Sequence, residues 1–418
     1  MKNRRITLRK SAFRVIGERF VFYFLFFNMI AIDFIYRINP NFFIPSFVLA
    51  VMPVILAWVW IFTENWRLVH IYCDVLVFLL CVLAMLSYAL YGNVFMAKIV
   101  FSPSFLVLMT TCLFLYTRED LTNIFEHLDA VCIIIGAIVC LYTVSFLNVS
   151  YQELGNAYMM VGYSLSVCVI ILCEFARIRK KKNYYFIATA FSIVILAYGN
   201  RGAILSVLAY FIISTVFFQN IKTTKFHALF VFFLLAVGIF AFVLFDDLIS
   251  MLASLFDSFG ISSRSIESIL THSFSQSTGR NAIYGKAFDI IKRHPFEIRE
   301  PGYMTAVYIN ARYINANAHN ILLELLVEYG CILGLLIFAV FVHKFIKSIR
   351  LLRKNVKIEN AMAFCLLLQA FVQLSFSATF YSNNEFWLGL VLTGILSRRK
   401  YRVKERSIHK NSTLVETG

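Results

Sequence analysis

The chain has 418 residues, of which 60% are hydrophobic and only 15% are charged, and its mean hydropathy is +0.76. This composition excludes a soluble globular protein of this size, because too few polar side chains remain to cover its surface. The formal net charge of +16 favours contact with anionic lipid headgroups and does not indicate a nucleic-acid partner.

Long apolar runs recur from Phe20 almost to the C-terminus. As helices, these runs are about long enough to cross a hydrocarbon core of roughly 30 Å. The sequence therefore predicts an all-α fold, in which residues 1–418 form a single polytopic membrane domain of about twelve transmembrane helices. The predicted spans are 20–36, 43–62, 71–91, 98–117, 130–149, 157–176, 184–199, 202–219, 226–245, 320–342, 359–380 and 384–397.

The placement of basic residues predicts the orientation of these spans. Lysine and arginine in short loops remain on the cytoplasmic side, and most of the 39 basic residues fall there when the N-terminus is placed inside. Both termini are then cytoplasmic, and the long segment 246–318, between spans nine and ten, lies on the outer side. Residues 1–19 are too polar and basic for a cleavable signal, so we expect the first span to be retained as an anchor.

The sequence contains no pattern for a metal or a nucleotide. The 9 cysteines have no C-x-x-C spacing, and most are expected to be small core residues. Asp246 and Asp247 are adjacent, no His/Cys cluster has ligand spacing, and there is no P-loop. We therefore expect neither a metal nor a cofactor, and a substrate that is already activated would have to supply the energy of a reaction.

Arg201 lies where the seventh predicted span turns into the eighth, within Tyr198-Gly199-Asn200-Arg201-Gly202. An arginine is costly at membrane depth, so it is expected to face a polar cavity or an anionic ligand. The alternative is an arginine whose side chain extends to the headgroup level.

The outer segment 246–318 contains a predicted amphipathic helix. Ser277 and Thr278 supply an N-cap before Arg280, apolar residues recur along one side, and Pro295 ends the helix. A turn at Pro301-Gly302 precedes three tyrosines that suit either the bilayer interface or a sugar: Tyr303, Tyr308 and Tyr313.

Arg280 is expected to open this helix, whose free N–H groups also attract anions. Together with Arg201 it could hold a diphosphate, because guanidinium groups bind phosphate oxygens in pairs. A salt bridge on the surface of the loop is the alternative for Arg280.

His319 stands where an apolar helix begins, and imidazole can accept a proton from a hydroxyl near neutral pH. Glu324 and Glu328 follow in the same helix, where a carboxylate facing lipid would be costly, so both are expected to point into the bundle. Either could orient His319, or both could have purely structural partners. A histidine at headgroup level without a catalytic role is the other interpretation of His319.

These motifs resemble those of the bacterial O-antigen polymerase and O-antigen ligase group of membrane glycosyltransferases. The resemblance covers mainly residues 195–340. It rests on four features, namely Asn200-Arg201-Gly202, Thr278-Gly279-Arg280, the stretch from Pro295 to Gly302, and His319-Asn320 followed by nine residues and Gly330. Ligases of this group tend to have a small residue or tyrosine three positions after that glycine. Here Leu333 occupies that position and Gly334 comes one place later.

The resemblance implies transfer of a glycan from undecaprenyl diphosphate, on the periplasmic face of the bacterial inner membrane, without a metal or nucleotide. Arg201 and Arg280 would hold the diphosphate, and His319 would deprotonate or orient the acceptor hydroxyl. Asn320, Glu324 and Tyr303 are further candidates for substrate binding. The expected partners are the undecaprenyl-diphosphate-linked glycan, membrane lipids and, as the family suggests, a polysaccharide chain-length regulator.

Three functions remain open at this point. The leading hypothesis is a polymerase that joins lipid-linked repeat units of a surface polysaccharide such as O-antigen. The alternative within the family is a ligase that transfers finished polymer to lipid A-core. From another class, a non-catalytic flippase or transporter of lipid-linked oligosaccharide would place its charges along a central cavity, whereas the predicted cations gather at one outer rim.

Overall fold

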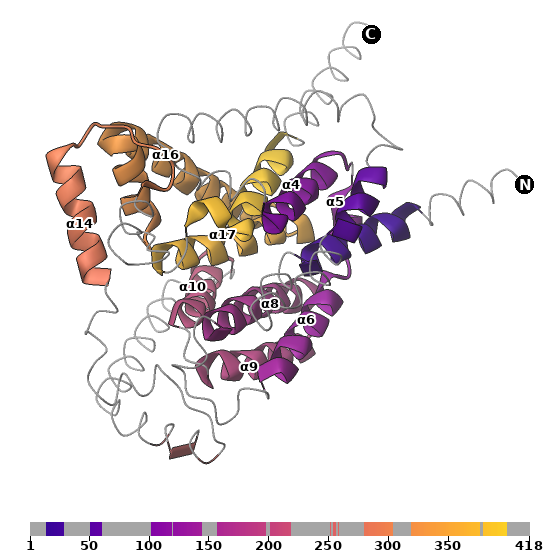
Figure 1. The fold of residues 1–418 in the computed structure, drawn as a ribbon. Helices are drawn as coiled ribbons and strands as arrows, with labels where there is room; N and C mark the ends of the chain where they lie inside the picture. The colour runs from indigo at the N-terminus through magenta and orange to yellow at the C-terminus, as the bar shows by residue number, and fades with distance from the viewer. Residues whose placement is uncertain are drawn as a thin grey trace, which may run out of the picture. The chain divides into compact units, whose positions relative to one another are not determined.

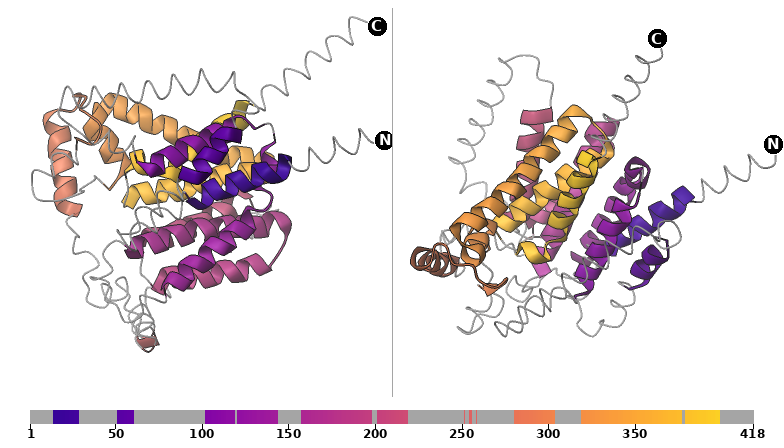
Figure 2. Two further views of the ribbon diagram at one scale, coloured as in Figure 1. Left: turned by 45° about the vertical axis from the view of Figure 1, so that its right-hand side comes forward. Right: turned by 90° about the horizontal axis from the view of Figure 1, so that it is seen from above.

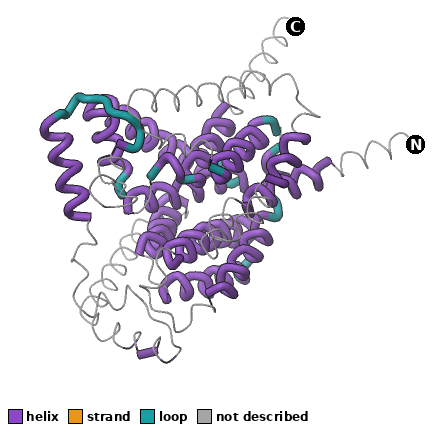
Figure 3. The backbone as a smooth tube through the Cα atoms, in the orientation of Figure 1, coloured by secondary structure: helices purple, strands orange, loops and turns teal. Residues whose placement is uncertain are grey.

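The computed structural model describes a large part of the chain, and all regular secondary structure in that part is helical (Figure 3). The described residues are 14–28, 51–60, 102–118, 120–143, 157–197, 201–218, 251, 254–255, 258, 280–303, 319–376 and 379–398. Within them, 4 helices are long and apolar enough to cross a membrane. The predicted all-helical membrane class is therefore confirmed, whereas the predicted number of about twelve spans is not confirmed.

Figure 1 labels the main helices. They are α4 (Pro103–Tyr116), α5 (Leu121–Phe125), α6 (Leu128–Thr143), α8 (Ala157–Arg179), α9 (Asn183–Ala197), α10 (Arg201–Phe218), α14 (Arg280–Arg293), α16 (Ile321–Lys354) and α17 (Ile358–Phe376). Further helical segments cover 14–28, 51–60 and 384–398, and a 3-10 helix, η4, covers Phe380–Ser382. The predicted spans 71–91 and 226–245 lie outside the described residues.

The helix at predicted span ten extends beyond the predicted end of that span at residue 342. α16 continues to Lys354 and contains 34 residues on the two sides of a kink at Gly330. The part after the kink, residues 331–354, is by itself about 36 Å long at 1.5 Å per residue. That length exceeds a hydrocarbon core of roughly 30 Å. The extension is rich in lysine, arginine and leucine, which favour helix, and its last turn carries Arg353 and Lys354.

The chain divides into two compact units. One contains Met1–Val131 and Ile283–Gly418, and the other contains Cys132–Ala282. In the second unit, α8 packs against α9 and α10. Gly202, in the first turn of α10, lies so close to the hydroxyl of Tyr163 on α8 that no Cβ would fit between them. This close approach explains why a glycine follows Arg201.

In the first unit, α16 and α17 lie side by side (Figure 2). Residues 355–357 connect the two helices, so they run in opposite directions. Their shared core is apolar and aromatic, and it includes Ile321, Leu325, Phe341, Leu367, Ala370, Leu374, Phe380, Tyr381 and Phe386. Because lipid tails are as apolar as these side chains, close packing rather than transfer from water holds two membrane helices together.

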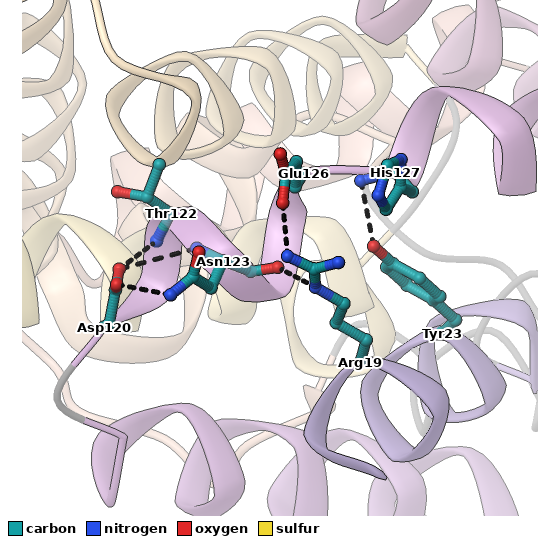
Figure 4. Close-up of polar contacts among 7 residues, drawn as sticks. All are labelled: Arg19, Tyr23, Asp120, Thr122, Asn123, Glu126 and His127. Carbon is teal, nitrogen blue, oxygen red and sulfur yellow. Dashed lines mark hydrogen bonds and ion pairs between the residues drawn. The ribbon is translucent and has the colours of Figure 1, made fainter. Parts of the chain in front are cut away.

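A group of ion pairs lies near the start of α17, and we call it the Arg19 cluster. Arg19 donates to the carbonyl of Asn123 at 2.7 Å and forms an ion pair with Glu126 (Figure 4). Arg118 pairs with Glu18 at 2.7 Å, and Thr122 donates to Glu359 at 2.9 Å. The cluster therefore joins residues near the N-terminus, the connection around α5 and the first turn of α17.

Candidate functional site

The candidate site is built around the first three turns of α16. Asn320 is the N-cap of this helix, and its side-chain oxygen accepts hydrogen bonds from the N–H groups of Leu322 at 3.0 Å and Leu323 at 3.2 Å. These bonds satisfy two of the donors that a helix start leaves without a partner. Span ten is predicted to begin at residue 320, and α16 begins one residue later, at Ile321.

His319, immediately before this cap, has a φ of 49°. Positive φ is uncommon for a residue with a Cβ, and strained positions of this kind cluster at functional sites. The residue is half-buried. The backbone therefore holds His319 in a defined position at the head of α16, which is what a proton-transfer group requires.

Three turns into α16, the helix breaks at Gly330, which has φ 69° and ψ 170°. This region of backbone conformation is almost restricted to glycine. A Cβ at this position would also lie 3.0 Å from the carbonyl carbon of Phe296 and 3.2 Å from the carbonyl oxygen of Glu297. Gly330 is therefore required both by its own backbone angles and by the chain that passes next to it.

The break frees backbone groups that a continuous helix would pair internally, and the segment 295–302 satisfies them. The N–H of Cys331 donates to the carbonyl of Pro295 at 2.6 Å instead of to a helical partner. Arg299 donates from its backbone N–H to the carbonyl of Glu328 at 2.6 Å, and from Nη1 to the carbonyl of Val327 at 2.9 Å. Irregular backbone at membrane depth is tolerated where such protein groups replace the lost partners.

Arg299 is only 7% exposed, and each side of its guanidinium group has a neighbour. Nη2 pairs with Glu297 at 2.6 Å, and the group lies over the ring of Tyr303 at 5.2 Å. A buried arginine with these partners has a structural role, because its charge is already paired within the protein.

Glu328 is fully buried at 0% exposure and uses both carboxylate oxygens. Oε1 accepts from the backbone N–H of Gly302 at 2.7 Å, and Oε2 accepts from the hydroxyl of Tyr381 at 2.6 Å. The hydroxyl groups of Tyr381 and Tyr329 are also 2.6 Å apart. Burial, and then the nearby Glu328 carboxylate, raise the pKa of Tyr381 well above its ordinary value, so its hydroxyl remains a donor.

Glu324, one turn earlier, is 3% exposed and accepts a hydrogen bond from the hydroxyl of Thr379. Both carboxylates thus point into the protein, as expected for acids in an apolar helix. We refer to Arg299, Gly302, Glu324, Glu328, Thr379 and Tyr381 as the Glu328 cluster. The predicted action of Glu324 on His319 or on a substrate remains a prediction.

The amphipathic helix predicted in the outer segment is confirmed as α14, which ends at Arg293, before Pro295. The predicted cap, Ser277 and Thr278, lies outside the described residues. The apolar side of α14 packs on the first turns of α16. The cluster contains Ile283, Tyr284, Ala287, Ile290, Ile291, Tyr303, Leu323 and Val327.

The predicted turn at Pro301-Gly302 is also confirmed, with φ 77° at Gly302. Tyr303, directly after this turn, belongs to the same apolar cluster, and its contact with a substrate remains a prediction.

Arg201 and Arg280 are the first residues of α10 and α14, and their side chains lie outside the described part of the structure. Both residues belong to the unit Cys132–Ala282, whereas His319 belongs to the other unit. Their convergence on one diphosphate is still a prediction. Within the described residues, no group of three or more His, Cys, Asp or Glu side chains could hold a metal ion.

Sequence reasoning did not identify Arg299, Thr379 or Tyr381 as parts of the site. All three contact α16 from positions far along the chain or from an irregular segment, and no local pattern marks such contacts. Two signals were available: the stretch from Pro295 to Gly302, which contains Arg299 and belongs to the family resemblance, and Gly330, because a glycine inside an otherwise apolar helix suggests a close approach of backbone.

Comparison with protein families gives a match to the O-antigen ligase family over residues 185–339. The match covers less than half of the chain and confirms the resemblance noted in the sequence. It extends from α9 to just beyond the break at Gly330 and thus includes the whole connection between α14 and α16. No curated protein and no solved structure matches the chain.

Proposed function

We propose that this protein is a membrane glycosyltransferase that joins lipid-linked oligosaccharide units into a surface polysaccharide such as O-antigen. The observation that carries the proposal is the O-antigen ligase domain at residues 185–339, together with the ordered head of α16 inside it. The domain supports an activity of the ligase and polymerase type on a glycan. The strained His319 and the cap at Asn320 support a fixed catalytic group at this place.

The proposed reaction is a displacement at the anomeric carbon of the donor sugar. A hydroxyl of the acceptor glycan attacks this carbon, and His319 takes the hydroxyl proton. The bond to the diphosphate oxygen breaks, and undecaprenyl diphosphate leaves with the bonding electron pair. Arg201 and Arg280 stabilise the charge that develops on the leaving group. General-base assistance contributes about 10²- to 10⁴-fold to such a step.

The distribution of polar contacts along α16 and α17 supports the placement of the site at one end of this helix pair. The Glu328 cluster joins the segment 295–303, which the charge pattern predicts to be outside, to residues 319–328 and 379–383, which include the predicted outer ends of spans ten and eleven. The Arg19 cluster joins segments predicted to be inside, namely 14–23, 118–127 and 357–359. Since α17 runs from one cluster to the other, this grouping agrees with the predicted orientation.

A ligase that transfers finished polymer to lipid A-core is the second candidate. The description of the matching family favours it, whereas Leu333 stands at the position where ligases of this group tend to have a small residue or tyrosine. The two activities share the donor and the proposed chemistry and differ in the acceptor. The same three side chains would therefore act in both.

A deletion strain separates these functions when its lipopolysaccharide is separated on a gel. Loss of a polymerase leaves core with a single added unit. Loss of a ligase leaves core alone while polymer accumulates on undecaprenyl diphosphate. Unchanged long-chain banding would contradict an O-antigen function, and core alone with single lipid-linked units in the inner leaflet would indicate a flippase. Restoration by the wild-type chain, but not by His319→Ala at equal membrane abundance, would support the proposed chemistry.

A further inference from the structure

The carboxylate of Glu328 occupies an unusual place in the site, because it joins three separate segments. Its backbone belongs to α16, its Oε1 accepts the N–H of Gly302, and its Oε2 accepts the hydroxyl of Tyr381. Because Gly302 directly precedes Tyr303, the contact holds the last residues of the segment 295–303 against α16. The next residue that the structure describes along the chain is His319, at the head of the same helix.

We propose that Glu328 is a positioning residue. It fixes the segment 295–303 against the broken helix α16, so that the groups proposed to act on the glycan keep fixed positions relative to one another. The proposal rests on the glycosyltransferase function proposed above. Glu328 touches neither donor nor acceptor in it. It acts through Gly302 and Tyr303 on one side and through the course of α16 towards His319 on the other.

The location of Glu328 beside the break explains why a side chain is needed there. Backbone bonds already attach this segment at Pro295 and at Arg299, but both precede the turn at Pro301-Gly302. Beyond Pro301, the Glu328 carboxylate holds the backbone of Gly302, next to the apolar packing of Tyr303 on Leu323 and Val327. Removing the carboxylate would leave the start of the segment attached and would leave the backbone at Gly302 held by apolar packing without this hydrogen bond.

The chemistry of the contact also predicts which substitutions are tolerated. Glutamine keeps an acceptor for the Gly302 N–H, and its amide can donate to Tyr381, whose hydroxyl can then donate to Tyr329. Methionine has a similar length and packs well in an apolar environment, but it lacks a comparable acceptor. Glu328→Gln should therefore preserve the attachment, and Glu328→Met should remove it.

Hydrogen–deuterium exchange on the purified full-length protein tests this attachment directly. In Glu328→Met, exchange should rise in the peptide 295–303 and remain unchanged in 336–350, which lies in the second half of α16. Glu328→Gln should match the wild type in both peptides. Tyr329→Phe is the matched control, because it removes a neighbouring hydroxyl that does not contact Gly302. Unchanged exchange at 295–303 in Glu328→Met would overturn the proposal, and so would an increase spread over the whole unit.

The second measurement is polysaccharide synthesis in the deletion strain at equal membrane abundance. We expect Glu328→Met to lose about 10- to 100-fold of the long-chain product, which is the scale of a displaced reacting group. Glu328→Gln should restore it to near the wild-type amount. A glutamine variant as defective as the methionine variant would overturn the positioning role, because charge rather than hydrogen bonding would then be the requirement.

The two measurements also separate this proposal from the proposed function. If the deletion strain keeps all its polysaccharide, the glycosyltransferase function fails, while the exchange experiment still decides whether Glu328 holds the segment. If Glu328→Met does not accumulate, Tyr381→Phe takes its place. This variant removes one of the two hydrogen bonds to the carboxylate and should raise exchange at 295–303 to a smaller extent, and no change there would overturn the proposal.

Discussion

The two polar ends of the α16 and α17 pair use carboxylates in different ways. In the Arg19 cluster, Glu18 and Glu126 pair with guanidinium groups, and Glu359 accepts from the hydroxyl of Thr122. In the Glu328 cluster, the buried carboxylates of Glu324 and Glu328 accept from hydroxyl groups and a backbone N–H, while Arg299 pairs with the exposed Glu297.

The difference bears on how an anionic substrate could be bound. The two buried carboxylates on α16 are ordered by neutral donors. In the proposed reaction, the guanidinium groups of Arg201 and Arg280 would bind the diphosphate. At the Arg19 end the charges cancel within the protein, which suits an anchoring function.

The largest effect expected from this comparison is that of His319→Ala. Loss of the general base should lower turnover by about 10²- to 10⁴-fold, whereas membrane abundance should be retained, because Asn320 still caps α16. The amount of long-chain product on a lipopolysaccharide gel measures turnover, and immunoblotting of the membrane fraction measures abundance. Long-chain product at the wild-type amount would exclude His319 from catalysis.

Replacement of Arg201 or Arg280 by lysine is expected to have the next largest effect. Lysine keeps the positive charge but loses the planar pair of donors that matches a phosphate, so we expect long-chain product to fall by about 10-fold, the equivalent of 1.4 kcal/mol. The matched control is Arg293→Lys, at the exposed last turn of α14. Equal losses in all three variants would point to general charge effects and against a diphosphate site.

Gly330→Ala tests the break in α16. Forcing a Cβ into φ 69° and ψ 170° costs about 1–3 kcal/mol, and the close approach of Phe296 adds to it. We expect lower thermal stability in detergent and a partial loss of product. Gly285→Ala is the control, because a Cβ at this exposed glycine of α14 would meet nothing within 4 Å. That change should be neutral or stabilising, since alanine favours helix by about 1 kcal/mol.

Much of this region follows from local sequence. The end of α14, the turn at Pro301-Gly302, the cap at Asn320 and the burial of Glu324 and Glu328 are all predictable, since each depends on residues within a turn or two or on the cost of charge in an apolar helix. The end of α16 at Lys354 is not predictable in this way, because the basic residues that suggest a cytoplasmic loop also favour helix.

The contacts of the Glu328 cluster follow from no local pattern. Tyr381 lies 53 positions from Glu328 and Thr379 lies 55 positions from Glu324, and their pairing depends on how α17 returns beside α16. Gly330 shows the same limit. Its spacing from His319 is visible in the sequence, but the reason for a glycine there is the passage of Phe296 and Glu297 against the helix.

The smallest effect is expected at the opposite end of the α16 and α17 pair, for Glu126→Gln in the Arg19 cluster. The ion pair with Arg19 is partly exposed, with 20% and 46% of the two side chains accessible, and exposed pairs of this kind are worth less than about 1 kcal/mol. Arg19 also keeps its hydrogen bond to the Asn123 carbonyl. Long-chain product should therefore stay at the wild-type amount, and a thermal shift in detergent should be slight. A loss of product at normal abundance would contradict the assignment of this end to anchoring alone.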